Sequence, residues 1–290
     1  MSRKIFLYNN LAGHGKIHEA VEKIAEAYAD SLIVNVTDEN AYDTLYSVIG
    51  TDDEIVICGG DGTLNYFVNS TKNAPLSNTI FYYAMGSGND FLRDVDGKVD
   101  ELVDVTAHLR NLPSVTVNGE EYLFINGVGF GIDGYCCEVG DKQKKKSDKP
   151  VNYTSIAING LLFKFKPRTA TVKVDGVEYT FKKTWIAPTM NGRFYGGGMM
   201  PTPAQDRHNP DGTISFLAFH GSSKLKTLMI FPSLFKGEHV KHTKHISIIT
   251  GKEIEVTFDQ PTSLQIDGET VLGVTSYKAT AAAVVPTHAE

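Results

Sequence analysis

The chain has 290 residues, enough for two domains with sizeable cores, and its hydrophobic fraction of 41% and charged fraction of 21% are ordinary for a globular protein. Its formal net charge of −6 argues against a protein that binds nucleic acid through its overall charge. The three cysteines include no Cys-x-x-Cys pair and no apolar stretch reaches the roughly 18 residues of a membrane span, so we expect a cytoplasmic protein without a zinc site or disulfide framework.

In the first third of the chain, expected strands alternate with expected helices. Apolar runs predict strands at 4–9, 31–37, 54–60 and, ending in a glycine loop, 79–90. Apolar residues at helical spacing predict helices at 17–29, 41–49 and 63–71. Such alternation implies a parallel sheet with helices on its faces. The glycine-bearing loops at 9–15, 59–63 and 86–90 each follow a strand, so they should share the carboxyl edge of the sheet, where ligands bind.

From about residue 113 the sequence becomes rich in short extended runs. Asn118-Gly119 and Asp175-Gly176 each separate two such runs, which predicts hairpins. A helix is expected at 151–163 inside an otherwise antiparallel β-sandwich. We therefore predict an α/β domain with a parallel sheet over 1–112 and a β-rich domain over 113–275. The apolar tail, 276–290, can return to either domain.

The stretch "ICGGDGTLN" (57–65) has the layout of a phosphate-binding loop. A strand, a glycine turn and a helix let backbone N–H groups and the positive helix end face an anion. The structural alternative is a tight turn in which Asp61 or Thr63 caps the following helix. A second loop, "MGSGNDFLR" (85–93), also follows a strand and offers Ser87 and Asp90, which favours phosphate binding.

The two aspartates, Asp61 and Asp90, would repel phosphates unless a cation lay between them. Phosphoryl transfer uses Mg²⁺ on the phosphate oxygens and often a carboxylate that accepts the proton of the attacking hydroxyl. The loops therefore suggest that a triphosphate is consumed. Walker and protein-kinase motifs are absent from the sequence. One weak dinucleotide-like match, "GFGIDG" (129–134), precedes "YCCEVGDKQKKK", which does not have the pattern of the amphipathic helix that a dinucleotide fold needs. We therefore expect a bend or bulge there.

Five motifs occur in an order that resembles the bacterial diacylglycerol-kinase-like lipid kinases. They are "GGDGTLN" (59–65), "GSGNDF" (86–91), "GFGID" (129–133), "GGGMMPTPAQDRHNPDG" (196–212) and "IDGE" (266–269). The resemblance covers nearly the whole chain. It implies a nucleotide-binding α/β domain of the NAD kinase/diacylglycerol kinase type, a β-sandwich domain for the lipid, and an active site in the cleft between them. It also implies transfer of the ATP γ-phosphate to a lipid hydroxyl, most simply of a diacylglycerol, with Mg²⁺.

The resemblance implies functional roles for particular residues of this sequence. The implied catalytic residues are Glu269 or Asp267 as proton acceptor, with Asp61 and Asp90 around catalytic Mg²⁺. The implied nucleotide-binding residues are Asn9, Asn10, Gly13, Thr37, Gly59, Gly60, Asp61, Gly62, Thr63, Asn65, Gly86, Ser87, Asn89 and Asp90. The implied ligands of a structural Mg²⁺ are Asp211 and the backbone oxygens of His208 and Thr213. The chain departs from the family at Asn10 (usually Pro), Tyr66 (usually Glu) and Ser87 (usually Thr), which affects the adenosine pocket more than phosphate handling.

Several alternatives stay open on the sequence. "DGE" is also a good hairpin turn, and Asp61 could itself be the base while "DGE" only shapes the cleft. Asp211 could be a free turn carboxylate. The lysine run from Lys142 to Lys149, with "LLFKFKPR" (161–168), is either a solvated loop or a contact with the inner face of a membrane. Exposed strand edges leave a homodimer open. The rival functions are an NAD kinase and a non-catalytic sensor of lipid or nucleotide.

Overall fold

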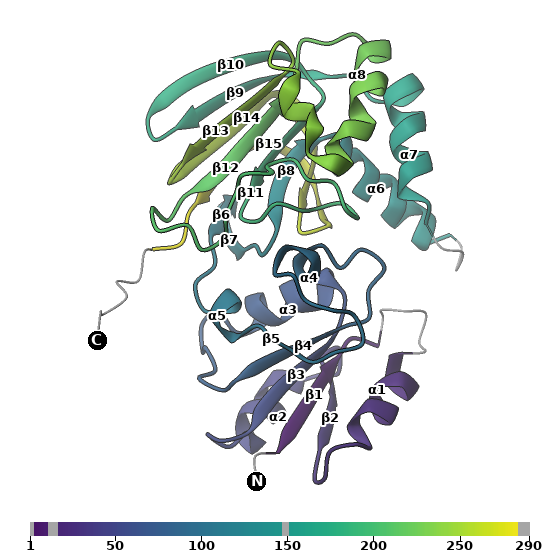
Figure 1. Ribbon diagram of the computed structural model, residues 1–290, viewed down its shortest axis with the longest axis vertical. Helices are drawn as coiled ribbons and strands as arrows, with labels where there is room; N and C mark the ends of the chain where they lie inside the picture. The colour runs from purple at the N-terminus through teal and green to yellow at the C-terminus, as the bar shows by residue number, and fades with distance from the viewer. Residues whose placement is uncertain (1–2, 11–16, 147–150, 284–290) are drawn as a thin grey trace. The chain divides into compact units, whose positions relative to one another are not determined.

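A computed structural model describes residues 3–10, 17–146 and 151–283. The chain divides into two compact units, Met1–Arg110 and Asn111–Glu290, each built around its own sheet (Figure 1). Over the ranges described, no helix has the length and apolar content needed to cross a membrane.

The first unit is the expected α/β domain. Its sheet has the order β2-β1-β3-β4-β5, with β1–β4 parallel and only the short β5 antiparallel. The strands are β1 (Lys4–Tyr8), β2 (Leu32–Asn35), β3 (Glu54–Gly59), β4 (Ile80–Ala84) and β5 (Val103–Asp104). The helices are α1 (Ile17–Ala25), α2 (Ala41–Val48), α3 (Asp61–Thr71), α4 (Asp90–Asp94) and α5 (Thr106–Leu109).

The central strands of this sheet, β1 and β3, are buried along almost their whole length. Helix α1 covers one face, where Val21 joins Phe6 and Val56 in one apolar cluster. Neighbouring residues of β1 and β3, such as Leu7 and Ile57, are equally buried although they point to the opposite face. Continuous burial of both faces is what a parallel sheet requires, and it explains the unbroken apolar runs in the sequence.

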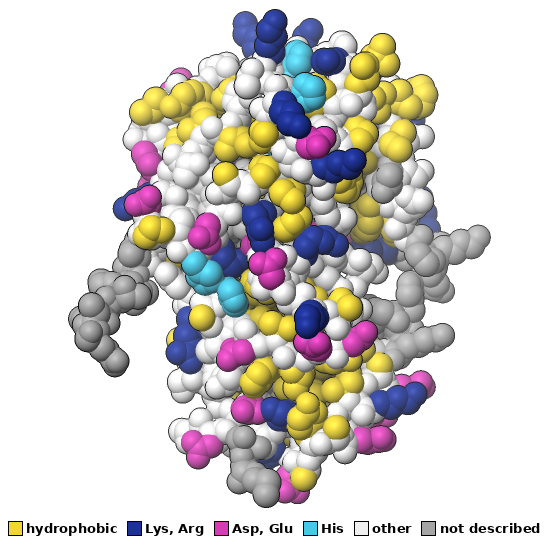
Figure 2. All heavy atoms as spheres, viewed as in Figure 1, with side chains coloured by type: hydrophobic (Ala, Val, Ile, Leu, Met, Phe, Trp, Pro, Cys, Tyr) yellow, Lys and Arg dark blue, Asp and Glu magenta, His cyan; other side chains and the backbone are white. Residues whose placement is uncertain are grey.

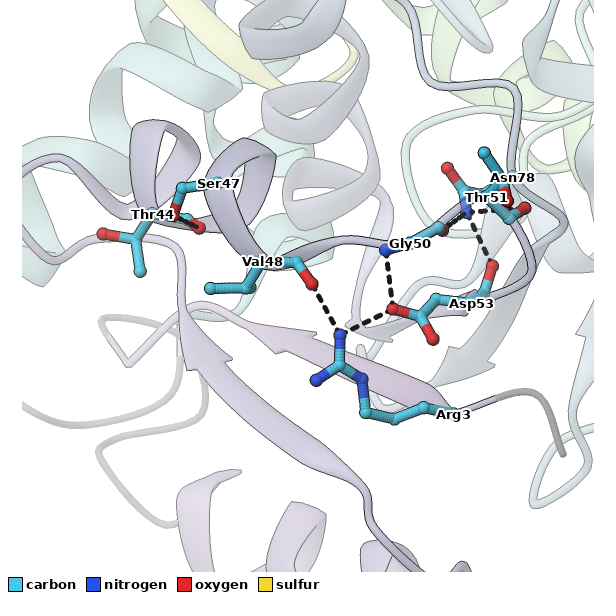
Figure 3. A network of polar contacts seen from close by, with 8 residues as sticks. All are labelled: Arg3, Thr44, Ser47, Val48, Gly50, Thr51, Asp53 and Asn78. Atoms are coloured by element: carbon cyan, nitrogen blue, oxygen red, sulfur yellow. Dashed lines mark hydrogen bonds and ion pairs between the residues drawn. The ribbon is translucent and has the colours of Figure 1, made fainter.

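A polar network closes the amino edge of this sheet, as Figure 3 shows. Arg3, just before β1, donates to the Val48 carbonyl at 2.7 Å and pairs with Asp53 at 2.6 Å. Asp53 also accepts from the Gly50 N–H, and Asn78 donates to the carbonyls of Gly50 and Asp53. The bond from Arg3 holds the pKa of Asp53 below its usual range. This edge is therefore built for stability, and the opposite edge carries the glycine loops.

The second unit contains one antiparallel sheet of ten strands. They are β6 (Ser114–Val117), β7 (Glu120–Leu123), β8 (Gly127–Gly131), β9 (Arg168–Val174), β10 (Val177–Thr184), β11 (Ile186–Met190), β12 (Ile214–Phe219), β13 (Ile246–Gly251), β14 (Glu253–Ile266) and β15 (Glu269–Thr280). The helical elements are α6 (Ile132–Lys144), α7 (Tyr153–Asn159), the π-helical η2 (Gly160–Lys164), α8 (Lys224–Ile230) and the 3₁₀ helices η3 (Phe231–Lys236) and η4 (Glu238–Lys241).

The predicted hairpins are confirmed. Asn118 and Asp175 have φ of 51° and 48°, and each is followed by a glycine at φ 86°, so both turns use the left-handed region that Asn-Gly and Asp-Gly favour. The predicted α/β domain with a mostly parallel sheet and the antiparallel β-rich second domain are both confirmed as well.

One expectation needs correction. The stretch after "GFG" is not a bend, because α6 begins at Ile132 and runs to Lys144. Its glycines let it pack closely: a Cβ on Gly134 would lie 2.1 Å from the Ser263 carbonyl oxygen of β14. Of the two alternatives for the tail, residues 276–280 take the second unit, since β15 pairs with β14 and β6 through Thr280; residues 284–290 lie outside the described residues.

Candidate active site

Two glycine loops touch backbone to backbone at the carboxyl edge of the first sheet. A Cβ on Gly86 would lie 2.5 Å from the Gly60 Cα, closer than real side chains come. The Gly59 carbonyl ties the loops together, because it accepts from the Met85 N–H at 2.8 Å and from the Tyr82 hydroxyl at 3.0 Å. Only glycine at both contact positions permits this approach. The loops after β3 and β4 therefore form one joint surface of backbone.

Asp61 holds these two loops in place. Its carboxylate accepts from the backbone N–H groups of Asp90 at 2.9 Å and Phe91 at 3.1 Å, at the start of α4. The Asp61 carboxylate, from the first residue of α3, therefore reaches the helix of the other loop. Asp90 is buried and forms an ion pair with Arg93 at 2.9 Å. Both aspartates are thus engaged in the architecture of the loops.

The same loops offer groups that suit a phosphate. Helix α3 begins after Gly60 without a side-chain cap, so the positive end of an 11-residue helix faces the loop. Asn89, in the left-handed region at φ 48°, has a buried Oδ1 that finds no hydrogen-bond partner within the described structure; this oxygen is an acceptor, so it suits a cation rather than the phosphate itself. Ser87 is exposed beside it, whereas Thr63 is buried and packs back on Gly59. Asn65 is buried in α3, where Asn69 donates to its Oδ1 at 3.2 Å.

The first loop is organised by Asn35, a residue that the sequence motifs did not single out. Its Oδ1 accepts from the Asn10 N–H at 3.1 Å and from the N–H and hydroxyl of Thr37 at 3.3 and 2.8 Å. Asn9 also lies at this edge, directly after β1, while Gly13 lies outside the described residues. The only signal in the sequence was a polar residue that ends a strand at the ligand-binding edge.

In the second unit, Asp267 and Glu269 flank the tight turn between β14 and β15. Asp267 accepts three backbone N–H groups, from Ile125 at 2.6 Å, Asn126 at 2.8 Å and Gly127 at 2.9 Å. Glu269 begins β15, is exposed, and lies within electrostatic reach of Lys144. A carboxylate that already accepts three N–H groups is a poor proton acceptor. Asp267 is therefore held in the turn by backbone N–H groups, whereas Glu269 is exposed, and the choice of the base among Glu269, Asp267 and Asp61 stays a prediction.

The loop of the implied structural Mg²⁺ is closed on itself by amide groups. The Thr213 carbonyl accepts from the Gln205 side chain at 2.9 Å and from the Asn209 side chain at 2.9 Å, which uses both of its lone pairs. The His208 N–H donates to Asp206, and Asp211 is exposed. No group of three His, Cys, Asp or Glu side chains suited to a metal occurs within the residues described. As arranged here, Thr213 does not fit a cation, and this site stays a prediction.

Asp133, in the first turn of α6, is a buried carboxyl of the second unit. It is 7% exposed, and neither of its oxygens has a hydrogen-bond partner within the described part of the chain. Burial raises its pKa to about 7. Gln265 and Tyr195 lie near enough to lower that pKa partly, and the buried Tyr277 responds to the charge of Asp133. A buried carboxyl that ionises near neutrality beside the turn of β14 and β15 is a second feature that the motifs alone did not reveal.

Two family descriptions match the chain. The diacylglycerol kinase catalytic domain matches residues 3–117, and the YegS C-terminal NAD kinase beta sandwich-like domain matches residues 126–288, more than half of the sequence. The chain belongs to the diacylglycerol kinase-like lipid kinases. A diacylglycerol kinase of Mycobacterium tuberculosis is 25% identical over 266 residues, covering 86% of this lipid kinase and 83% of the relative.

A crystal structure of a diacylglycerol kinase from Bacillus anthracis has the same fold as this lipid kinase. The superposition has a TM-score of 0.66 at 18% sequence identity, and it covers 97% of this chain and 94% of the Bacillus anthracis chain. Membership of a lipid kinase family implies a nucleotide donor and a lipid acceptor. The first unit presents touching glycine backbone and an uncapped helix start at one place, which are groups that suit the phosphates of such a donor.

Proposed function

We propose that this lipid kinase transfers the γ-phosphate of ATP to the hydroxyl of a diacylglycerol-type lipid. The observation that carries the proposal is the contact between Gly60 and Gly86, which joins two phosphate-type loops into one backbone surface. A loop that only turned the chain would have no need of a second glycine loop pressed against it. Asp61 preserves that contact through its two N–H bonds to the second loop.

The proposed roles of the residues follow from their surroundings. The loops at 59–63 and 86–90 hold the triphosphate through backbone N–H groups, with Ser87 as a hydroxyl donor. Asn9, Asn10 and Thr37 meet the nucleoside end, with Asn35 fixing the last two. Glu269 accepts the proton of the attacking lipid hydroxyl, and Asp267 fixes the turn that presents it.

Mg²⁺, when bound, would neutralise charge on the phosphate oxygens. Asp61 and Asp90 are the residues proposed to hold it. Their oxygens accept backbone N–H and Arg93 bonds but are carboxylate oxygens with further lone pairs, so the donor set is chemically suited to a hard cation. The proposal involves no cation at Thr213.

The test is a transfer assay with γ-labelled ATP and Mg²⁺. The purified protein is incubated separately with diacylglycerol, sphingoid bases, phosphatidylglycerol, polyprenols and NAD. Label in the diacylglycerol product supports the proposal, and label in another lipid would keep the lipid kinase and replace the substrate. Label only in NADP would establish the NAD kinase instead. ATP binding without transfer to any acceptor would establish the sensor.

A further inference from the structure

The helical layer of the second unit has one buried face and one exposed apolar face. Ile156 and Leu161, from α7 and η2, share a buried cluster with Ile230 and Leu234, from α8 and η3. The opposite sides of the same elements expose large apolar side chains, with Phe163 70%, Leu225 71% and Met229 68% accessible. We call this the helical face; its members are Ile158, Leu162, Phe163, Leu225, Met229 and Phe235.

The helical face is continuous although its parts are about 60 residues apart in the sequence. The Lys224 ammonium, at the start of α8, donates to the Leu162 carbonyl of η2 at 3.1 Å. Helix α8 packs against η2, which continues α7 (Figure 1), and Figure 2 shows hydrophobic side chains gathered over these helices, with Lys and Arg side chains close to them. Six exposed apolar side chains on one helical layer are more than the scattered single residues of an ordinary surface.

The two sequence stretches that form the helical face carry only positive charges. The sequence has no Asp or Glu in 151–174 or in 212–237, although the chain as a whole carries a net charge of −6. The cations of these stretches near the face are Lys164, Lys166, Arg168, Lys224, Lys226 and Lys236. Three of these cations line a hollow of about 180 Å³ together with Tyr135 and Glu138: Lys164, Lys166 and Arg168. The negative charge of Glu138 is offset by its ion pair with Lys142.

We propose that the helical face seats the protein on a membrane surface that contains anionic lipid. Its apolar side chains would enter the boundary between headgroups and acyl chains, and its cations would contact the phosphates of the headgroups. The proposal rests on the proposed function, because a diacylglycerol acceptor resides in a membrane, and the described residues include no helix that could span one.

Charge complementarity favours a membrane over a second copy of this chain. A symmetric contact through the helical face would bring the lysines of one copy against those of the other, whereas anionic headgroups complement them. The lysine run at 142–149 is less suited to the same task. Lys142 pairs with Glu138, Lys144 pairs with Asp141 at 3.6 Å, and residues 147–150 lie outside the described structure.

Vesicle co-sedimentation with the full chain tests the proposal. The probes are phosphatidylcholine vesicles with and without phosphatidylglycerol. We expect binding that needs phosphatidylglycerol and weakens as salt is raised. Lys164→Glu with Lys226→Glu should weaken it by at least about fivefold per charge. Phe163→Ala with Met229→Ala should weaken it on the order of tenfold.

Matched controls use side chains of similar exposure on other surfaces. Val99→Ala with Val177→Ala is the apolar control, and Lys98→Glu with Lys173→Glu is the charge control. Both controls should bind vesicles as the unmodified chain does. Unchanged unfolding midpoints in all variants would show that folding is intact.

Kinase assays separate the failure of this inference from the failure of the proposed function. With a short-chain, water-dispersed diacylglycerol, the helical-face variants should retain activity, and with long-chain diacylglycerol in vesicles they should lose it. Vesicle binding that is unchanged in both helical-face variants would overturn the docking surface, whatever the activity. A helical-face variant that changes the molecular mass in solution but not vesicle binding would overturn it in favour of self-association. Vesicle binding that needs the helical face, with no transfer to any acceptor, would uphold the surface and refute the kinase.

Discussion

Replacing Glu269 and Asp61 by their amides should separate proton transfer from loop architecture. Glu269 is exposed at the first position of β15, so Glu269→Gln should change the free energy of unfolding by no more than about 0.5 kcal/mol. If it is the base, turnover should fall by roughly 10²- to 10⁴-fold while the affinity for ATP stays close to that of the unmodified chain.

Asp61→Asn should have the opposite signature. The carboxylate accepts two backbone N–H groups with its two oxygens, and an amide has only one oxygen to offer. At least one N–H of α4 then loses its acceptor, which costs about 1–3 kcal/mol and lowers the unfolding midpoint of the first unit by several degrees. The loops lose their cross-link, so the affinity for ATP falls together with stability.

Three measurements on each variant decide between these roles: urea unfolding followed in both units, equilibrium binding of ATP, and single-turnover transfer to lipid. The contrary result would be an Asp61→Asn protein with unchanged stability and unchanged ATP affinity but no transfer, together with a Glu269→Gln protein that still turns over. Asp61 would then be the base, and the reasoning from its two N–H bonds would be wrong.

Three further substitutions probe the remaining features. Asp267→Ala leaves three backbone N–H groups without their acceptor and should destabilise the second unit by about 3 kcal/mol or more in urea unfolding; a neutral result would mean that the turn holds itself. Gly86→Ala drives a Cβ into Gly60 and should weaken ATP binding about tenfold, whereas the control Gly50→Ala, whose Cβ has 3.5 Å of clearance, should not. Burial raises the pKa of Asp133 from 3.8 to about 7, so the protonated carboxyl is favoured in the folded state. The contribution of Asp133 to the free energy of unfolding is therefore fully present below pH 3.8 and is lost as the pH rises through about 7. Asp133→Asn should remove that loss and stabilise the second unit at pH 8 by up to roughly 4 kcal/mol; an unchanged pH profile of unfolding would show that the carboxyl ionises freely.

The sequence predicted the local elements well because their signals are local. Unbroken apolar runs predicted β1 and β3, and Asn-Gly and Asp-Gly predicted the hairpin turns at 118–119 and 175–176. The parallel order of the first sheet followed from alternation alone, which then predicted that the glycine loops share an edge. What the pattern could not supply was the pairing of β14 with β8 and β9 as well as β15.

Contacts between distant residues were beyond any pattern in the sequence. Asp267 binds N–H groups that lie about 140 residues earlier, and nothing near it in the chain identifies them. Helix α6 was missed for a related reason. Its packing uses Gly134 against a carbonyl of β14 and Gly140 against the ring of Tyr153, and two glycines in 13 residues weaken a helical pattern that tertiary contacts then support.

Asp61 and Asp267 each lie beside a glycine in a turn, and they have the same structural role in the two units. Each accepts N–H groups of a segment far from it in the chain, so each locks a flexible turn to a second element. A carboxylate bound by N–H dipoles presents less negative potential to its surroundings than a free one. Asp61 is therefore compatible with a loop that is proposed to bind an anion, because the same N–H bonds that fix the loop offset its charge. The variant Asp61→Asn, which removes the charge and keeps most of the shape, is for this reason expected to bind ATP less well and not better.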